Sequence, residues 1–544
     1  MEKILLVEPE YNNKYPPIGL MKIASYHKMR GDYVEFYKGN APFNIISKMD
    51  RVYITSLFTF YYDKTVETIL HYANYIDKSK IYIGGIAITL MNEKFKEVTG
   101  VKNILTGQLT DSSKIGYNDN INIDILPLDY DILDDVEHEY GVADNFFAYT
   151  TRGCPRKCRF CAVKTLEPQF LDTNNIVKQI SAVRQKYGDK RSIMLMDNNV
   201  IFSLNLQKIC DDLVELGFEK DKATYIPENP AKVFFLKVDR RLALGNATWM
   251  IEDKFISYLT KFVTRIKKVE VFNTLKIIIE ETKKSDNPLS ILNQYKEDII
   301  NIVEKYRLKK PLQRYVDFNQ GLDARLLTDE KMRILSVLPL RPFRLAYDDI
   351  NSTTDYMRAF KIAYHHGVRH FSNYMLYNYE DTPEDFWQRA YNNIKLYNEY
   401  PDVNAFSFPM KYAPIDMTDR TYIGANWNKK YLASMNIILN VTKGVIVKEM
   451  DFFIRAYGET QQEFREILSM PTEFIKYRQL FDDLGLTEAW RLLFRELDES
   501  ETNSLLSYVS GESDIKINND KLLAYYKVTK RQIETKKLNL SEYL

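Results

Sequence analysis

Three cysteines lie within a stretch of eight residues, in the segment Thr151-Arg-Gly-Cys154-Pro-Arg-Lys-Cys158-Arg-Phe-Cys161. Their spacing, three residues and then two, lets one loop present three thiolates to a single metal centre. Glycine and proline flank the first cysteine and suit a loop that must wrap closely. Four basic residues beside the triad favour thiolates and offset the charge of an anionic cluster. They are Arg152, Arg156, Lys157 and Arg159.

Zinc is the first alternative, but a closed structural zinc site needs four ligands. The fourth cysteine, Cys210, lies in the amphipathic stretch Leu204–Leu216, where a small buried side chain is expected. The only histidine within forty residues of the triad is His138. Three thiolates on a four-iron cluster leave one iron without a protein ligand, and catalysis needs such an open position. The sequence therefore predicts a 4Fe-4S cluster held by Cys154, Cys158 and Cys161.

The triad, with Phe160 before its last cysteine and a strand before its first, resembles the radical S-adenosylmethionine (radical SAM) superfamily over roughly residues 145–415. In that family the open iron binds the amino and carboxylate groups of S-adenosylmethionine. The reduced cluster then cleaves the sulfonium and gives a 5′-deoxyadenosyl radical. The resemblance implies an enzyme that modifies an unactivated C–H position of a substrate that the sequence does not name. It also implies an electron donor such as flavodoxin or ferredoxin.

The resemblance further implies that polar residues after successive strands bind S-adenosylmethionine. Arg325 could pair a carboxylate through two hydrogen bonds. Asp348 stands where relatives often carry Glu in a Gly-Ile-Glu-Ser pattern, and the Gly and Ser are absent here. Each of these residues could instead cap a helix or solvate a loop. The full cofactor-binding set is Phe160, Asp197, Asn198, Asn199, Gln320, Asp323, Arg325 and Asp348.

The start of the chain resembles the members of the superfamily that carry an N-terminal cobalamin-binding domain. The similar segments are ILLVEPEYNNKYPPIGLMKIASYHKMRGDYV and YIGGIAIT. Many such domains place Asp-x-His-x-x-Gly after the first strand, whereas the loop here, PEYNNKYPPIGL, has no histidine. His138 misses that spacing and lies elsewhere. Two reactions therefore remain open. One is methyl transfer that depends on cobalamin, and the other is a radical reaction without cobalamin.

Two other classes of function remain as alternatives. The first is an enzyme acting on a nucleic acid, and the second is a non-catalytic metal-binding or nucleic-acid-binding module in which the triad is structural. The cysteine count leaves no second set for an auxiliary cluster, which argues against methylthiotransferases and against peptide-modifying members with extra clusters.

The elements that position these residues alternate between strands and helices, which predicts an α/β fold with parallel sheets. Residues 1–140 are expected to form a Rossmann-like domain, which the resemblance implies is of the cobalamin-binding type. Its expected strands are Ile4–Glu8, Tyr33–Tyr37, Val52–Leu57, Ile81–Gly84 and Asn103–Thr106, and its expected helices include Ile18–Met29 and Asp63–Ile76. Gly84 and Gly85 end a strand and mark either a cofactor edge or a tight turn.

Residues 141–417 are expected to form a partial (β/α)6 barrel of the radical SAM type, with chemistry at the carboxyl ends of its strands. The expected strands are Phe146–Thr151, Ile193–Asp197, Tyr315–Asn319, Phe343–Tyr347, Phe371–Leu376 and Ala405–Met410. Ser352 with Asp355 and Thr382 with Asp385 are candidate helix caps. Residues 418–544 are predicted to be a mostly helical C-terminal domain.

Residues 219–314 are far too long for a loop between a helix and a strand, so we expect a helical insertion there. Its expected helices include Lys254–Val271 and Ser290–Tyr306. The insertion holds 20 basic and 13 acidic residues, an excess of seven positive charges. A solvated face is the favoured interpretation, and contact with a phosphate backbone is the alternative. Its aromatic residues at helical spacing are expected in its core.

The net charge, the apolar runs and the N-terminal segment indicate where the protein is located and which partners it does not favour. The net charge of +1 does not favour binding of the whole surface to nucleic acid or to an anionic membrane. No apolar run approaches the roughly 18 residues of a membrane span. The N-terminal segment MEKILLVEPE lacks the features of a secretory signal, so a cytoplasmic location is expected.

Overall fold

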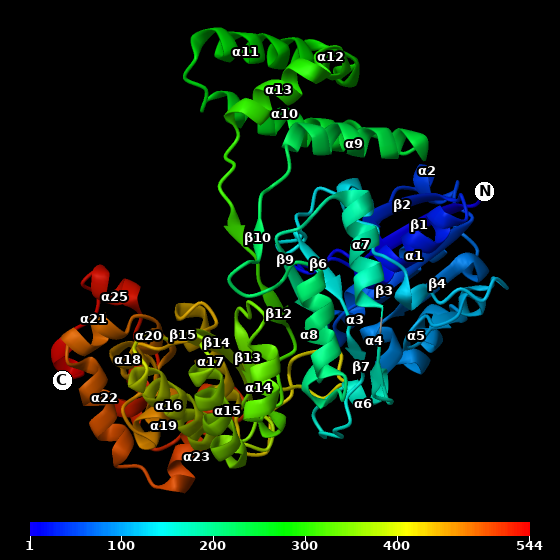
Figure 1. Ribbon diagram of the computed structural model, residues 1–544. Coiled ribbons are helices and arrows are strands. Elements are labelled where there is room, and N and C mark those ends of the chain that lie inside the picture. The colour runs from blue at the N-terminus through cyan, green and yellow to red at the C-terminus, as the bar shows by residue number, and fades with distance from the viewer. Residues whose placement is uncertain (174) are drawn as a thin grey trace. The chain divides into compact units, whose positions relative to one another are not determined.

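The computed structural model describes residues 1–173 and 175–544, which form two compact units (Figure 1). The first unit comprises residues 1–320, 334–340 and 415–419, and the second comprises 321–333, 341–414 and 420–544. Helices and parallel sheets occur in both, which confirms the mixed α/β class. No helix in the described part of the chain is both long enough and apolar enough to cross a membrane.

The first unit begins with a five-stranded parallel sheet of order β2-β1-β3-β4-β5. The interior strand β1 is apolar and almost fully buried, as is typical of a parallel strand covered on both faces. Every predicted strand of this region is confirmed to within a residue or two. The bounds are β1 Lys3–Glu8, β2 Tyr33–Lys38, β3 Arg51–Ser56, β4 Ile81–Gly85 and β5 Asn103–Leu105, with α1 Ile18–Met29, α3 Tyr62–Ala73, α4 Ile86–Leu90 and α5 Asn92–Thr99.

A second sheet of this unit has the order β12-β9-β6, again all parallel. Its strands are β6 Asn145–Ala148, β9 Ser192–Leu195 and β12 Val316–Phe318, and helices α7 Ile176–Tyr187 and α8 Leu206–Glu215 follow β6 and β9. The predicted strand Phe146–Thr151 is interrupted after Ala148. The chain then forms a short antiparallel pair, β7 Thr151–Arg152 with β8 Leu171–Asp172, which frames the cysteine loop.

The predicted insertion is a helical subdomain with its own apolar core, reached through the short pair β10 Thr224–Tyr225 and β11 Leu312–Gln313. Figure 1 shows its helices in green at the ends of two extended segments. The predicted helix Lys254–Val271 is wrong in its bounds, since the chain turns between α10 and α11. The helices are α9 Pro230–Ala243, α10 Trp249–Val263, α11 Val269–Lys284, α12 Pro288–Gln294 and α13 Lys296–Tyr306. Phe262 is buried in this core, and Tyr258, Phe272 and Tyr295 pack against it, as expected.

Part of the positive charge of the insertion fastens it to the rest of the unit. Arg240 makes two hydrogen bonds of 2.8 and 2.9 Å to Asp131. Arg241 pairs with Asp135 at 2.5 Å, and Lys237 pairs with Asp134 at 2.8 Å. These partners lie in one short helical segment, Asp131–Asp135. Three of its basic residues therefore have a structural role.

The second unit is built on the sheet β13-β14-β15-β16, parallel except for its last strand. The bounds are β13 Phe343–Ala346, β14 His370–Tyr377, β15 Asn404–Lys411 and β16 Ile446–Val447, with α14 Asp329–Leu335, α15 Thr353–His365 and α16 Pro383–Glu399. Thr382 and Asp385 form the predicted capping box. The other predicted cap is wrong, since the Ser352 side chain makes no capping hydrogen bond and bonds the Asp349 carbonyl instead.

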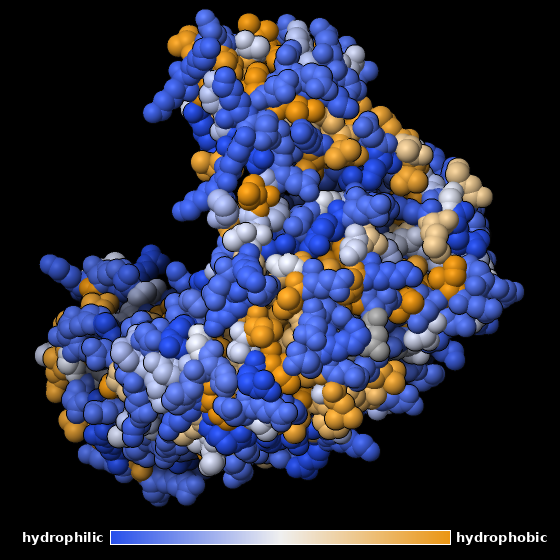
Figure 2. Space-filling view, viewed as in Figure 1, coloured by the Kyte–Doolittle hydropathy of each residue, from blue (hydrophilic) through white to orange (hydrophobic). Residues whose placement is uncertain are grey.

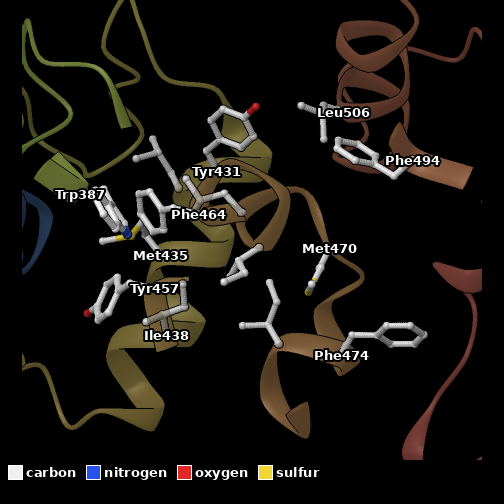
Figure 3. Packing of buried hydrophobic residues seen from close by; sticks show 14 of the residues in the cluster. Trp387, Tyr431, Met435, Ile438, Tyr457, Phe464, Met470, Phe474, Phe494 and Leu506 are labelled. Carbon is white, nitrogen blue, oxygen red and sulfur yellow. The ribbon is translucent and has the colours of Figure 1, made fainter. Parts of the chain in front are cut away.

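The C-terminal region is helical, as predicted, and packs a large apolar core with α16. Figure 3 shows part of this core, with aromatic and aliphatic side chains meeting between the helices. Figure 2 shows hydrophilic residues over most of one face, with apolar residues scattered among them. The helices are α17 Lys429–Val441, α18 Met450–Tyr457, α19 Gln461–Ser469, α20 Thr472–Lys476, α21 Arg478–Asp483, α22 Leu486–Arg495, α23 Glu499–Val509, α24 Asp520–Tyr525 and α25 Lys530–Glu534.

All six strands predicted for a barrel form, and they fall into two sheets, one in each unit. The first three strands make the sheet β12-β9-β6, and the last three make β13-β14-β15. A single six-stranded barrel therefore remains a prediction.

Candidate metal centre

The cysteine loop begins at the carboxyl end of β6 and is anchored by Asp197, which follows the neighbouring strand β9. The buried Asp197 carboxylate accepts hydrogen bonds from the Thr150 amide at 3.0 Å and from both threonine hydroxyls, of Thr150 and Thr151, at 2.7 Å. It also accepts one from the Thr151 amide. Burial raises the pKa of Asp197, while these hydrogen bonds act in the opposite direction. Asp197, which is also predicted to bind a cofactor, thus fixes the entry to the loop.

Gly153 occupies a place in the loop that only glycine suits. Its φ is +72°, and a Cβ there would lie 2.1 Å from the Gln169 carbonyl oxygen. Its amide donates a hydrogen bond of 2.6 Å to Oε2 of Glu167. Glu167 follows the short helix α6, Val163–Leu166, so the two ends of the loop are tied together.

The three cysteines form no disulfide with the described residues, and all three are half-buried on the loop. Each thiolate of a four-iron cluster binds a different iron, and three cysteines on one loop can supply three of the four ligands. The donor set and its accessibility therefore fit a 4Fe-4S cluster. Cys210 is fully buried in α8, where burial raises its pKa to about 12, as expected of a structural cysteine.

Two asparagines after β9 reach the loop from its neighbouring strand. Asn199 is buried, and its Nδ2 lies 3.4 Å from Sγ of Cys154. Its Oδ1 is also buried and has no hydrogen-bond partner among the described residues. Asn198 donates a hydrogen bond of 2.8 Å to Oε2 of Glu167, the same oxygen that accepts from Gly153. The structure thus brings both predicted residues to the cysteine loop.

Gln320 follows β12, the third strand of the same sheet, and is exposed. Since β6, β9 and β12 run parallel, the cysteine loop, Asn198 and Gln320 lie at one edge of the sheet. Phe160 is half-buried within the loop. These positions agree with the expectation that polar groups gather at the carboxyl ends of the strands.

The other predicted residues belong to the second unit. Asp323 accepts a hydrogen bond of 2.7 Å from Nε of Arg325. Burial raises the pKa of Asp348 to about 6, against the opposing charges of Arg389 and Arg325. Arg389 is fully buried and donates to the carbonyl groups of Tyr347 and Asp348, both at 3.0 Å. Arg325 and Asp348 are therefore electrostatically coupled within this unit.

A cavity of about 300 Å³ lies in the first unit, between the cysteine loop and the carboxyl edge of the five-stranded sheet. Asn198, Glu167 and Arg152 line it on one side, and Gly84 and Gly85 line it on the other. Gly85 has a φ of +102°, and a Cβ there would lie 2.2 Å from the Ser56 carbonyl oxygen. The two interpretations of these glycines are therefore compatible, because Gly85 makes a tight turn and both glycines line the cavity.

No model of a known protein family matches the chain, and no curated protein matches it either. The assignment of function therefore rests on the residues and their geometry.

The cavity was tested for cobalamin, which the N-terminal resemblance suggests. Among the described residues that line it there is no histidine. His138 lines a different cavity, and its Nε2 lies 2.8 Å from the Asn13 carbonyl oxygen. Cobalamin, with its corrin ring and nucleotide tail, is also larger than the drug-sized ligands that fill a cavity of this volume. These residues therefore do not fit a histidine-bound cobalamin.

Sequence reasoning missed several residues that organise the site. Glu167 contacts Gly153, Asn198 and Arg152, yet it is a single acidic residue after the motif, without a recognisable spacing. Lys22 and Asp124 form a buried ion pair of 2.8 Å beside Arg152 and lie far from it in the sequence. No pattern in one sequence marks such long-range partners.

Proposed function

We propose that this protein is a radical SAM enzyme that uses a 4Fe-4S cluster on Cys154, Cys158 and Cys161 to modify an unactivated C–H position. The observation that carries the proposal is the position of the triad. The cysteines lie on one accessible loop at the carboxyl end of a parallel strand, and the neighbouring strand supplies a side-chain amide to Cys154. This is where α/β folds place ligands and reactive groups.

The three cysteines would hold three irons and leave the fourth for S-adenosylmethionine. When bound, the reduced cluster supplies the electron that cleaves the sulfonium and gives a radical able to abstract hydrogen. Asp197 keeps the loop in place through Thr150 and Thr151, and the Asn199 amide stabilises negative charge on Cys154. Glu167 closes the loop by bonding Gly153.

Asn198 and Gln320 follow β9 and β12 in the first unit and are our candidates for contacts to S-adenosylmethionine. Asp323, Arg325 and Asp348 lie in the second unit, and their binding of S-adenosylmethionine stays a prediction from the resemblance. The proposal includes the finer architecture, in which β6, β9, β12, β13, β14 and β15 follow one another as the strands of a partial radical SAM barrel. It also includes a cobalamin-binding-type Rossmann-like domain before it and a helical domain after it.

Within this proposal we favour a reaction without cobalamin, because the cavity at the cysteine loop is small and has no histidine among its described lining residues. A structural zinc module is the alternative, and it would need a fourth ligand beside the three cysteines. An electron donor such as flavodoxin or ferredoxin is part of the proposal, whereas a nucleic-acid substrate is not favoured.

Metal analysis of cysteine variants tests the cluster. We expect four irons and four sulfides in the reconstituted protein, and a large loss of both in Cys154→Ala, Cys158→Ala and Cys161→Ala. Cys210→Ala is the matched control and should keep its full content, because Cys210 is buried in α8 and is not part of the cysteine loop. Full cluster content in any variant of the triad would refute the assignment.

A further inference from the structure

The C-terminal helices of the second unit form a cavity of about 570 Å³, which we call the C-terminal cavity. It lies among α17, α18, α20, α21 and α25. We propose that this cavity binds an amphipathic carboxylate, in which one carboxylate group is carried on an apolar chain. The proposal goes beyond the proposed function, because none of the residues that carry it belongs to the cysteine loop or to the first unit.

The walls of the C-terminal cavity are largely apolar. Val441 and Phe452 are 55 % and 42 % exposed, so apolar side chains of α17 and α18 remain accessible there. Burial of apolar surface provides most of the affinity for a hydrocarbon chain, and apolar walls with a few polar groups are typical of small-molecule sites. We therefore expect a ligand with a substantial apolar part. The apolar lining residues are Ile438, Val441, Phe452, Ala456, Ile475 and Leu480.

The charged side chains that line this cavity are mostly cationic. One of them, Glu534, is acidic, and four are basic: Arg455, Lys476, Arg478 and Lys530. Glu534 pairs with Lys530 at 3.1 Å. The ammonium groups of Lys476 and Lys530 lie 5.2 and 4.7 Å from the centre of the Tyr477 ring, which also lines the cavity. Since the only lining anion is already paired, the other three cations attract a ligand of negative charge.

Arg478 is the cation with the fewest partners. It is half-buried and makes no hydrogen bond or ion pair with the described residues. Its Nε is enclosed by the protein, whereas its two terminal nitrogens are open to a ligand. Burial lowers the pKa of Arg478, although the charge of Asp482 acts in the opposite direction. A half-buried cation without a partner is costly, and a carboxylate that accepts two hydrogen bonds from a guanidinium removes that cost.

The walls and the cations together define the two ends of the ligand. An ammonium head group would add a cation to three that have no carboxylate partner, and an uncharged head group would leave Arg478 without an anion. The volume of the C-terminal cavity lies inside the range for small-molecule sites, about 300–1,000 Å³. It therefore suits a free molecule with a chain of medium length.

Three probes test the proposal on the full-length protein by isothermal titration calorimetry at neutral pH. Decanoate, 1-decanol and decylammonium have chains of nearly the same length, and their head groups are anionic, uncharged and cationic. We expect decanoate to bind about tenfold to a hundredfold more tightly than 1-decanol, the range expected when hydrogen bonds to a charged group form. Decylammonium should bind most weakly. Binding of decanoate that is no tighter than that of 1-decanol overturns the proposal.

A substitution of Arg478 tests the head-group contact. In Arg478→Gln most of the advantage of decanoate should disappear, whereas 1-decanol should bind as before because the apolar walls are unchanged. Arg531→Gln is the matched control, since Arg531 is an exposed residue of α25 and is not part of the cavity lining. An undiminished advantage in Arg478→Gln, or an equal loss in Arg531→Gln, contradicts the proposal. If Arg478→Gln fails to fold, the comparison of the three probes decides.

A second substitution tests the location. Val441→Asp places a negative charge in the lining, and Val441 is exposed, so the variant should fold and should bind decanoate about tenfold more weakly or worse. Leu492→Asp is the control, because Leu492 is 58 % exposed on α22 and outside the lining. Equal binding of decanoate to Val441→Asp and to the unaltered protein would place the ligand elsewhere and refute the proposal.

Vesicles of phosphatidylglycerol distinguish a free ligand from a membrane surface. Sedimentation of the protein with these vesicles, without binding of decanoate in calorimetry, would identify a membrane contact and overturn the proposal. None of these measurements uses the cluster. Failure to cleave S-adenosylmethionine would therefore refute only the proposed function, and failure to bind decanoate would refute only this inference.

Discussion

The side-chain amide of Asn199 lies 3.4 Å from the sulfur of Cys154, so the second strand of a parallel sheet contacts the metal loop that follows the first. Asn199 is buried and stands two residues after Asp197, which holds the start of the same loop. One short segment after β9 therefore both fixes the loop and donates a hydrogen bond to one of its sulfurs.

Replacing Asn199 should change the reduction potential of the cluster more than its assembly. Hydrogen bonds to cluster sulfurs stabilise the reduced, more negative state. We expect Asn199→Ala to keep its iron content and to lower the potential by roughly tens of millivolts. A redox titration followed by electron paramagnetic resonance measures this. Asn205→Ala, on an exposed residue that bonds Asp172, is the control. An unchanged potential with an intact cluster would remove Asn199 from this role.

Substitutions at two glycines with nearly the same φ can distinguish a specific effect on the cysteine loop from the general cost of placing alanine at a positive φ. Gly153 has a φ of +72° and no room for a Cβ, whereas Gly245 has a φ of +73° and nothing within 4 Å of that position. Gly245→Ala should cost about 1–2 kcal/mol and leave cluster assembly intact. Gly153→Ala should abolish assembly, because the Gln169 carbonyl blocks the methyl group. Iron content and thermal stability, measured together, compare them. Equal iron content in both variants would contradict the predicted loop geometry.

A buried lysine in the second unit predicts a dependence of stability on pH. Lys430 donates hydrogen bonds to Oγ of Ser434 at 2.9 Å and to the Met470 carbonyl at 2.5 Å. No carboxylate pairs with it in the described part of the chain, and burial lowers its pKa to about 7. The folded state loses this proton above pH about 7, whereas an unfolded lysine keeps it up to about 10.4. The unfolded state then binds more protons, so the free energy of unfolding rises with pH across this window.

Lys430→Met should remove this contribution. Relative to the variant, the unaltered protein should gain up to a few kcal/mol of stability between pH about 7 and 10. Urea denaturation at several pH values measures the difference. Lys429→Met alters the adjacent exposed lysine and should preserve the original pH profile. A constant difference between the unaltered protein and Lys430→Met across the window would show that the lysine titrates normally.

The sequence predicts local elements well because their signals are local. The strands of the five-stranded sheet follow from runs of apolar residues, and α1 was placed at its observed bounds, Ile18–Met29. The predicted helix over 254–271 fails because apolar residues continue through the turn between α10 and α11, where residues 264–268 contain neither glycine nor proline. Helical periodicity alone gives no sign of such a break.

In the candidate site, too, the sequence predicts residues that have a local signal and does not predict roles that depend on long-range contacts. The spacing of the cysteines predicts the metal loop, and the resemblance points to Asn199 because it follows the second strand. The sequence does not predict the roles of Asp197 and Glu167. Both residues hold the loop through hydrogen bonds to residues that lie 14 to 47 positions away in the sequence. The cavity also depends on tertiary packing, since it joins residues from the first strands of the chain to those after Cys161.

The most direct test of the central claim is the formation of 5′-deoxyadenosine. Anaerobically reconstituted protein is incubated with S-adenosylmethionine and dithionite, and the product is measured by chromatography and mass spectrometry. The account predicts 5′-deoxyadenosine in the unaltered protein and in Cys210→Ala, and none above background in Cys158→Ala. A fully loaded 4Fe-4S protein that produces no 5′-deoxyadenosine, or a Cys158→Ala variant that produces as much as the unaltered protein, would contradict it.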